Sequence, residues 1–130
     1  MAKGHRSQIK KERNKVNRDL RPQAHVKYAR VSDTKARIVL EQIKGKDVDT
    51  AMAILEYSPR YAAAVIAKAL KSAVANAVNN PPHIDHNKLY VEEVIANQGP
   101  TLKRIKPKAR GMANRINKRT SHISVILNQR

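Results

Sequence analysis

Residues 94–130 carry nine Lys or Arg residues and no Asp or Glu, although their pattern predicts two strands joined by a turn. The apolar runs 94–96 and 123–127 are typical of strands, and Gly99-Pro100 and Gly111 mark turns between them. Like charges that lie side by side in a hairpin repel one another. A basic β-hairpin is therefore favourable where a polyanion surrounds it, and nucleic acid is the commonest such partner.

The composition of the whole chain supports the same class of partner. Its 130 residues include 27 Lys and Arg against 10 Asp and Glu, which gives a formal net charge of +17. Such a balance favours nucleic acid or an anionic membrane surface. No apolar run approaches the roughly 20 residues of a membrane span, and the start of the chain lacks the apolar region of a secretory signal. Only four aromatic residues are present, all Tyr, so contacts to phosphates and to RNA shape are favoured over stacking on aromatic side chains.

Residues 1–22 form a basic N-terminal extension with too few apolar residues to build a core. We expect this extension to be disordered or partly helical when it is free. Its Lys and Arg side chains are candidates for RNA contacts: Lys3, Arg6, Lys10, Lys11, Arg13, Lys15, Arg18 and Arg21. A solvated tail without a role is the alternative, and an organelle transit peptide is disfavoured because Ser is scarce and two acids are present.

Residues 23–130 predict a single domain. A first strand includes Val26, Tyr28 and Val31, and a last pair of strands belongs to the hairpin at about 89–128, with its tip at about 100–112. Between them, three helices are predicted, beginning at Ser32, at Asp47 and at Ser58-Pro59; the third runs to about Asn79. The fold class is therefore α+β, with three helices packed on a small antiparallel three-stranded sheet, a long protruding basic β-hairpin and a disordered basic N-terminal extension.

Four stretches of the chain resemble the family of bacterial large-subunit ribosomal protein twenty-two, and they occur in the order of that family. They are Tyr28-Ala29-Arg30-Val31-Ser32 with Lys35 and Arg37, the helical stretch 72–80, the stretch 99–111 that begins Gly99-Pro100-Thr101, and the stretch 116–123 that includes Lys118-Arg119-Thr120. Together they cover about residues 24–128, and four ordered matches are a specific signal. The chain departs from the family at Asn97-Gln98, where acids are usual, and at Met112, where a basic residue is usual.

The resemblance implies a structural constituent of the large ribosomal subunit in the cytoplasm, which binds 23S-type rRNA and neighbouring ribosomal proteins. It also implies that the globular part lies near the opening of the peptide exit tunnel, and that the hairpin lines the tunnel wall beside the nascent polypeptide. The implied rRNA-binding residues are Arg30, Lys35, Arg37, Lys103, Arg104, Lys106, Lys108, Arg110, Arg115, Lys118, Arg119 and His122. The implied hairpin tip in the tunnel comprises Leu102, Lys103, Arg104, Ile105, Lys106 and Pro107.

Patterns for catalysis or cofactor binding are weak, and we expect a non-enzyme without a metal or cofactor. His83 and His86 have the spacing of metal ligands, but they follow two prolines in a predicted loop and no third ligand cluster follows. The alternative function is that of a histone-like DNA-architectural protein, in which Ile105 and Pro107 at the hairpin tip act as apolar wedges. A membrane-surface protein is a third class, disfavoured because the basic residues do not lie on an amphipathic helix.

Overall fold

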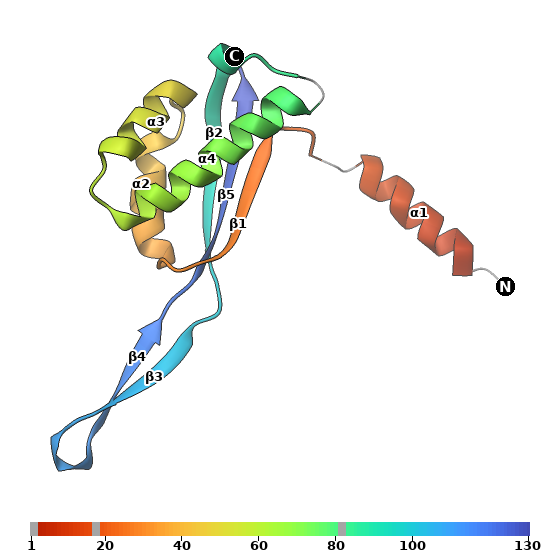
Figure 1. Ribbon diagram of the computed structural model, residues 1–130. Helices are drawn as coiled ribbons and strands as arrows, with labels where there is room; N and C mark the ends of the chain where they lie inside the picture. The colour runs from red at the N-terminus through yellow and green to blue at the C-terminus, as the bar shows by residue number, and fades with distance from the viewer. Residues whose placement is uncertain (1–2, 17–18, 81–82) are drawn as a thin grey trace.

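The body of the molecule is an antiparallel sheet with helices on one of its faces. The computed structural model describes residues 3–16, 19–80 and 83–130. In the sheet, β5 (Ser121–Gln129) lies between β1 (Gln23–Ala29) and β2 (Leu89–Gln98) and pairs antiparallel with both. The helices α2 (Asp33–Ile43), α3 (Val48–Tyr57) and α4 (Tyr61–Asn79) pack against this sheet, and the 3₁₀ turn η1 (His86–Lys88) leads into β2 (Figure 1). The predicted α+β class with a small antiparallel sheet is confirmed.

Local signals set most of the helix boundaries. The Ser32 hydroxyl accepts a hydrogen bond from the Lys35 N–H at the start of α2, at 3.4 Å. The prediction that Ser58-Pro59 opens the third helix is wrong, because α4 begins at Tyr61. A residue that precedes proline disfavours the helical conformation, so Ser58 is extended and caps the end of α3 instead.

The core lies between the sheet and the helices. On β5, the side chains of Ile123, Val125 and Leu127 alternate toward the helices and are at most 1% exposed. The buried stripe of α4 is mostly alanine, and small side chains allow this helix to pack closely: Ala62, Ala63, Ile66, Ala69, Leu70, Ala73 and Ala77. The opposite face of the sheet carries no helix in Figure 1.

Among the described residues, α4 is the one helix that is long and apolar enough to cross a membrane by length and composition. A core helix of a folded domain passes the same test, and α4 packs against α3, β1 and β5. This packing accounts for its apolar character without a membrane.

A second, two-stranded sheet extends away from the body (Figure 1). It pairs β3 (Leu102–Pro107) with β4 (Ala113–Lys118), and six residues per strand at about 3.3 Å each give a paired length of roughly 20 Å. We call residues 99–120 the arm. The chain reverses at residues 108–112, where the Lys108 N–H donates to the Met112 carbonyl at 2.7 Å and the 3₁₀ turn η2 (Ala109–Gly111) lies.

The turn of the arm lies at the far end of the range expected for the tip, about 100–112. The residues expected at the tip, Leu102 to Pro107, form β3, and Leu102 pairs with Lys118 at the base of the arm. Arg110 and Gly111 have the positive φ angles that close the turn, 59° and 69°, whereas Gly99-Pro100 marks the junction between arm and body.

At this junction the two chain segments approach each other closely. The Gly99 N–H donates to the Thr120 carbonyl at 2.8 Å, and the Thr120 hydroxyl donates to the Pro100 carbonyl at 2.6 Å. A Cβ at position 99 would lie 2.6 Å from Thr120 Oγ1, so only glycine fits without displacement of Thr120. The arm is thus attached to the body by a buried contact and not by a free linker.

In the N-terminal extension, α1 (Lys3–Val16) is helical, which agrees with the expectation of partial helix and not with a wholly disordered segment. The described chain thus has four α-helices, where the sequence predicted three. This segment is rich in Lys and Arg, which favour helix, and contains no proline. Figure 1 shows α1 standing apart from the body. Arg18 lies outside the described residues.

Candidate nucleic-acid interface

The arm presents cations on both of its faces. All twelve residues of β3 and β4 are exposed. Because partners across a strand pair share a face and successive residues alternate, Arg104, Lys106 and Lys118 lie on one face, and Lys103 and Arg115 on the other. Neither face of the arm therefore packs against the body.

The register of the arm also limits repulsion between its charges. Each Lys or Arg of β3 and β4 lies opposite a neutral residue, as in the pairs Lys103–Asn117, Arg104–Ile116 and Ile105–Arg115. Like charges directly opposite each other would destabilise a strand pair. The arm can therefore concentrate positive charge while it keeps its pairing, with Lys108 and Arg110 added at the turn.

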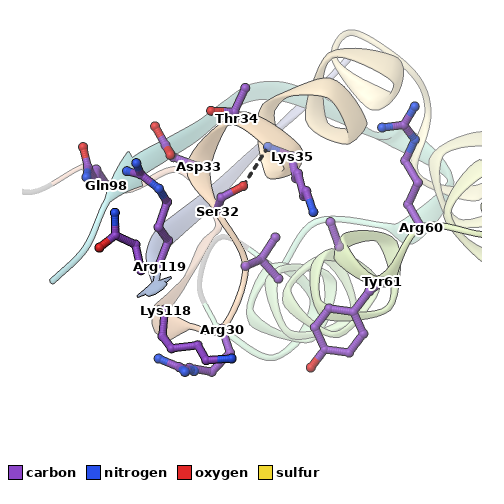
Figure 2. A pocket seen from close by; sticks show the side chains of 13 residues that line it. Arg30, Ser32, Asp33, Thr34, Lys35, Arg60, Tyr61, Gln98, Lys118 and Arg119 are labelled. Atoms are coloured by element: carbon purple, nitrogen blue, oxygen red, sulfur yellow. Dashed lines mark hydrogen bonds between the residues drawn. The ribbon is translucent and has the colours of Figure 1, made fainter. Parts of the chain in front are cut away.

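A basic pocket of about 1040 Å³ lies where the arm meets the helices. Figure 2 shows side chains from four parts of the chain around it: the segment that leads into α2, the start of α4, Gln98 at the end of β2, and the return of the arm into β5. We call this the junction pocket. Its cationic lining residues are Arg30, Lys35, Arg60, Lys118 and Arg119.

The electrostatics of the junction pocket favour an anion. Asp33 is the one acid among the lining residues, and its carboxylate lies 3.6 Å from the Arg37 guanidinium. The first turns of α2 and α4 both border the pocket, and the positive ends of their helix dipoles add to the charge of the side chains. A phosphate-rich ligand would meet this charge in a concave site.

Two of the expected RNA-binding residues have partners within the protein. The guanidinium of Arg37 donates from Nε and Nη2 to the Ala96 carbonyl, at 3.3 and 3.2 Å, which ties α2 to β2. The Nδ1 of His122 accepts a hydrogen bond from the Tyr28 N–H at 3.1 Å. These contacts give both side chains a structural role beside any RNA contact.

Among the cations of the extension whose side chains are described, none lines the junction pocket. Those of α1 with described side chains, Lys10, Lys11, Arg13 and Lys15, are exposed. Arg21 instead pairs with Asp19 at 2.7 Å and with Glu92 of β2 at 3.0 Å. The hydrogen bonds from Arg21 lower the pKa of Asp19 to about 2, and those to Asp19 and Glu92 raise the pKa of Arg21. Arg21 thus holds the end of the extension against the sheet.

The sequence profile of the family described as ribosomal protein L22p/L17e matches residues 24–128. Large ribosomal subunit protein uL22 of Lachnospira eligens is 60% identical over 130 residues, and the match covers all of both chains. The protein of the same name from Lachnoclostridium phytofermentans is 59% identical with the same coverage. That of Clostridium acetobutylicum is 57% identical over 107 residues, which are 82% of this chain and 96% of the relative.

The chain belongs to the L22p/L17e family. The predicted family membership is thereby confirmed, and with it a structural, non-enzymatic role in the large ribosomal subunit of the cytoplasm. Within that subunit the protein associates with rRNA and with other ribosomal proteins.

Arg60 and Tyr61 are residues of the junction pocket that the sequence did not single out. They stand outside the four stretches that resemble the L22p/L17e family, where Arg60 caps the start of α4 and Tyr61 is its first residue. The sequence signal that could have pointed to them as a binding site is a cation next to an aromatic residue, directly after Pro59. Only the approach of α4 to the arm joins them to Arg30 and Lys118.

The histidine pair does not form a ligand set in the fold. The ring of His83 lies 3.0 Å from the Val78 carbonyl, and that of His86 lies 3.7 Å from the Asp49 carboxylate. Within the described ranges, no group of three or more His, Cys, Asp or Glu residues is placed to hold a metal ion. His83 and His86 thus lie in the connection between α4 and β2, without a role as metal ligands in this arrangement.

Proposed function

We propose that this L22p/L17e protein binds large-subunit rRNA through two connected surfaces, the arm and the junction pocket. The single observation that carries the proposal is the distribution of charge on the arm, whose cations lie on both exposed faces with no acid among them. A ligand that contacts only one face would leave the two or three strand cations of the other face unneutralised. RNA that surrounds the arm would neutralise both faces.

The residues proposed for rRNA contact fall into two sets. The arm set comprises Lys103, Arg104, Lys106, Lys108, Arg110 and Arg115. The junction set comprises Arg30, Lys35, Lys118 and Arg119, to which the pocket adds Arg60. Arg37 is assigned to the contact between α2 and β2, and His122 to the contact between β5 and β1; their internal hydrogen bonds support that assignment.

The location within the subunit is also a proposal, and it rests on the family resemblance. The body would lie near the opening of the peptide exit tunnel, and the arm would line the tunnel wall beside the nascent polypeptide. The length and full exposure of the arm support this placement, because a narrow two-stranded element can enter RNA that a compact domain cannot. On this proposal, residues 1–22 are an RNA-binding extension of a single domain, residues 23–130.

The DNA-architectural alternative places an apolar wedge at the tip of the arm. Ile105 is 72% exposed, but it lies within β3 and opposite Arg115, not at the turn. The turn itself carries Lys108 and Arg110. The second predicted wedge, Pro107, is the last residue of β3 and lies beside the turn. Family membership therefore decides for the ribosomal function.

The test is to neutralise Lys103, Arg104, Lys106, Lys108 and Arg110 together by substitution with Gln. Binding to large-subunit rRNA should weaken, and the slope of log K against log salt should fall by about 0.7–0.9 for each phosphate that the arm no longer neutralises. The matched control replaces five exposed lysines away from both surfaces: Lys44, Lys46, Lys68, Lys71 and Lys88. An arm variant with the slope of the unaltered protein would contradict the proposal.

A further inference from the structure

Tyr28 has a backbone conformation that is unusual for a residue in a strand. Its φ is +56°, in the left-handed region that a side chain with a Cβ disfavours. The other described non-glycine residues with positive φ, His83 and Arg110, lie outside the strands. Such a conformation persists only where its surroundings hold it, and it is typical of functional positions.

A β-bulge in β1 produces this conformation. Val26 pairs with Ile123 and Ala29 pairs with Ser121, so Lys27 and Tyr28 together lie opposite the single residue His122. A bulge of this kind re-aims a side chain and is frequent at sheet edges. Here β1 is an edge strand of the sheet.

His122 holds Tyr28 in place from the neighbouring strand. The Tyr28 N–H donates to His122 Nδ1 at 3.1 Å, and the two rings meet edge to face, with centroids 4.8 Å apart and an angle of 82° between the ring planes. The buried neighbours of His122, Ser121 and Ile123, point toward the helices. His122 and the ring it contacts therefore lie on the open face of the sheet.

The ring of Tyr28 is not buried in the hydrophobic core. Its side chain stays 62% exposed in spite of its contact with His122. Two exposed cations, Lys27 and Arg30, flank it in the sequence, and Arg30 also lines the junction pocket. The surroundings thus suit a ligand with a flat apolar face and a nearby negative charge.

We propose that Tyr28 stacks on an unpaired nucleobase of the bound RNA, while Lys27 and Arg30 contact the adjoining phosphates. This inference rests on the proposed rRNA binding and deepens it. Proteins that bind unpaired RNA commonly stack bases on aromatic side chains of an open sheet. Such stacking tolerates any base, since every base has an aromatic face.

The decisive variants are Tyr28→Asn and Tyr28→Phe. Asn tolerates positive φ, so Tyr28→Asn removes the ring without a new backbone strain. We expect Tyr28→Asn to weaken binding to large-subunit rRNA by about 5- to 100-fold, and Tyr28→Phe to stay within about twofold of the unaltered protein. The slope of log K against log salt should not change in either, because stacking displaces no counterions.

Tyr57→Asn is the matched control. Tyr57 is 88% exposed at the end of α3, outside the arm and the junction pocket, so its removal should leave binding within about twofold of the unaltered protein. Ultraviolet crosslinking of the unaltered complex, followed by mass spectrometry of the peptides, should place a nucleotide on Tyr28 and none on Tyr57. This readout does not depend on the folding of any variant.

The possible outcomes distinguish failure of base stacking by Tyr28 from failure of rRNA binding. If the unaltered protein does not bind large-subunit rRNA, the proposed function fails. If it binds, but Tyr28→Asn binds equally well and no nucleotide crosslinks to Tyr28, the stacking proposal alone is overturned. Protection of Tyr28 by a neighbouring ribosomal protein, with no crosslinked nucleotide, would overturn it in the same way.

Discussion

At the scale of single residues, the contact between Gly99 and Thr120 determines how the arm joins the body. Thr120 is 5% exposed, and its hydroxyl and carbonyl bind the segment on the other side of the junction. The adjacent Ser121 is fully buried, and its hydroxyl has no hydrogen-bond partner in the described chain. Because the junction is buried and hydrogen-bonded, it fixes the direction in which the arm leaves the body, whereas a flexible linker would leave that direction free.

Thr120→Val tests this contact, because it keeps the shape of the side chain and removes its donor. The Pro100 carbonyl would lose a 2.6 Å hydrogen bond, with an expected cost of about 1 kcal/mol. For a domain of this size, this lowers the thermal midpoint by about 3–6 °C. Thr120→Ser retains the hydroxyl and should be destabilised less. Equal midpoints for Thr120→Val and the unaltered protein would show that the bond adds no stability.

At the scale of elements, the arm differs from the rest of the sheet in having no core. Every residue of β3 and β4 is exposed, whereas β5 has five buried residues among its nine. A two-stranded sheet without a hydrophobic face is marginally stable in water. The arm therefore depends on a partner for its rigidity, and the junction at Thr120 fixes only its base.

We expect residues 103–117 to be mobile in the free protein and ordered on RNA. Backbone order parameters should lie below about 0.6 near the turn at 108–112 in the free protein, and near 0.85 in β5, which serves as the internal reference. Amide relaxation measurements by NMR provide the test. A turn as rigid as β5 in the absence of RNA would mean that strand pairing alone orders the arm.

At the scale of the whole molecule, three parts have separate energetic roles. The body supplies the hydrophobic core, the arm supplies charge on both faces, and the extension supplies exposed cations on α1. The extension is anchored at its end, where Arg21 binds Glu92 and the Pro22 carbonyl accepts the Leu127 N–H at 2.8 Å. These contacts join the C-terminal end of the extension to β2 and β5.

Removal of residues 1–18 should weaken RNA binding and leave the thermal midpoint of the free protein nearly unchanged. This deletion removes cations but keeps the contacts of Asp19, Arg21 and Pro22. Removal of residues 1–22 takes these contacts away as well, and should lower the midpoint by several degrees. Thermal unfolding and rRNA titration of both proteins check this. A large drop for the shorter deletion would show that α1 packs on the body.

Much of this molecule follows from local features of its sequence. Charge balance and the absence of acids after Val94 indicated a polyanionic partner, and Ser32 and Asp47 indicated the starts of the first two helices of an α+β domain. These features depend on neighbours along the chain. Two local signals led to wrong predictions. Ser58-Pro59 predicted the start of a helix, but Ser58 caps the end of α3. Gly99-Pro100 predicted a turn near the tip of the arm, but it lies at the base of the arm.

Only the tertiary structure decided which cations act together. The junction pocket joins Arg30, Arg60 and Lys118 because the starts of two helices meet the base of the arm, and no spacing along the chain encodes that meeting. The same holds for Tyr28, whose role depends on a bulge opposite His122. Strand register distributes side chains between the faces of a sheet, and register arises from pairing between distant segments. The sequence by itself thus determined the kind of partner, and the fold determined the surfaces that meet it.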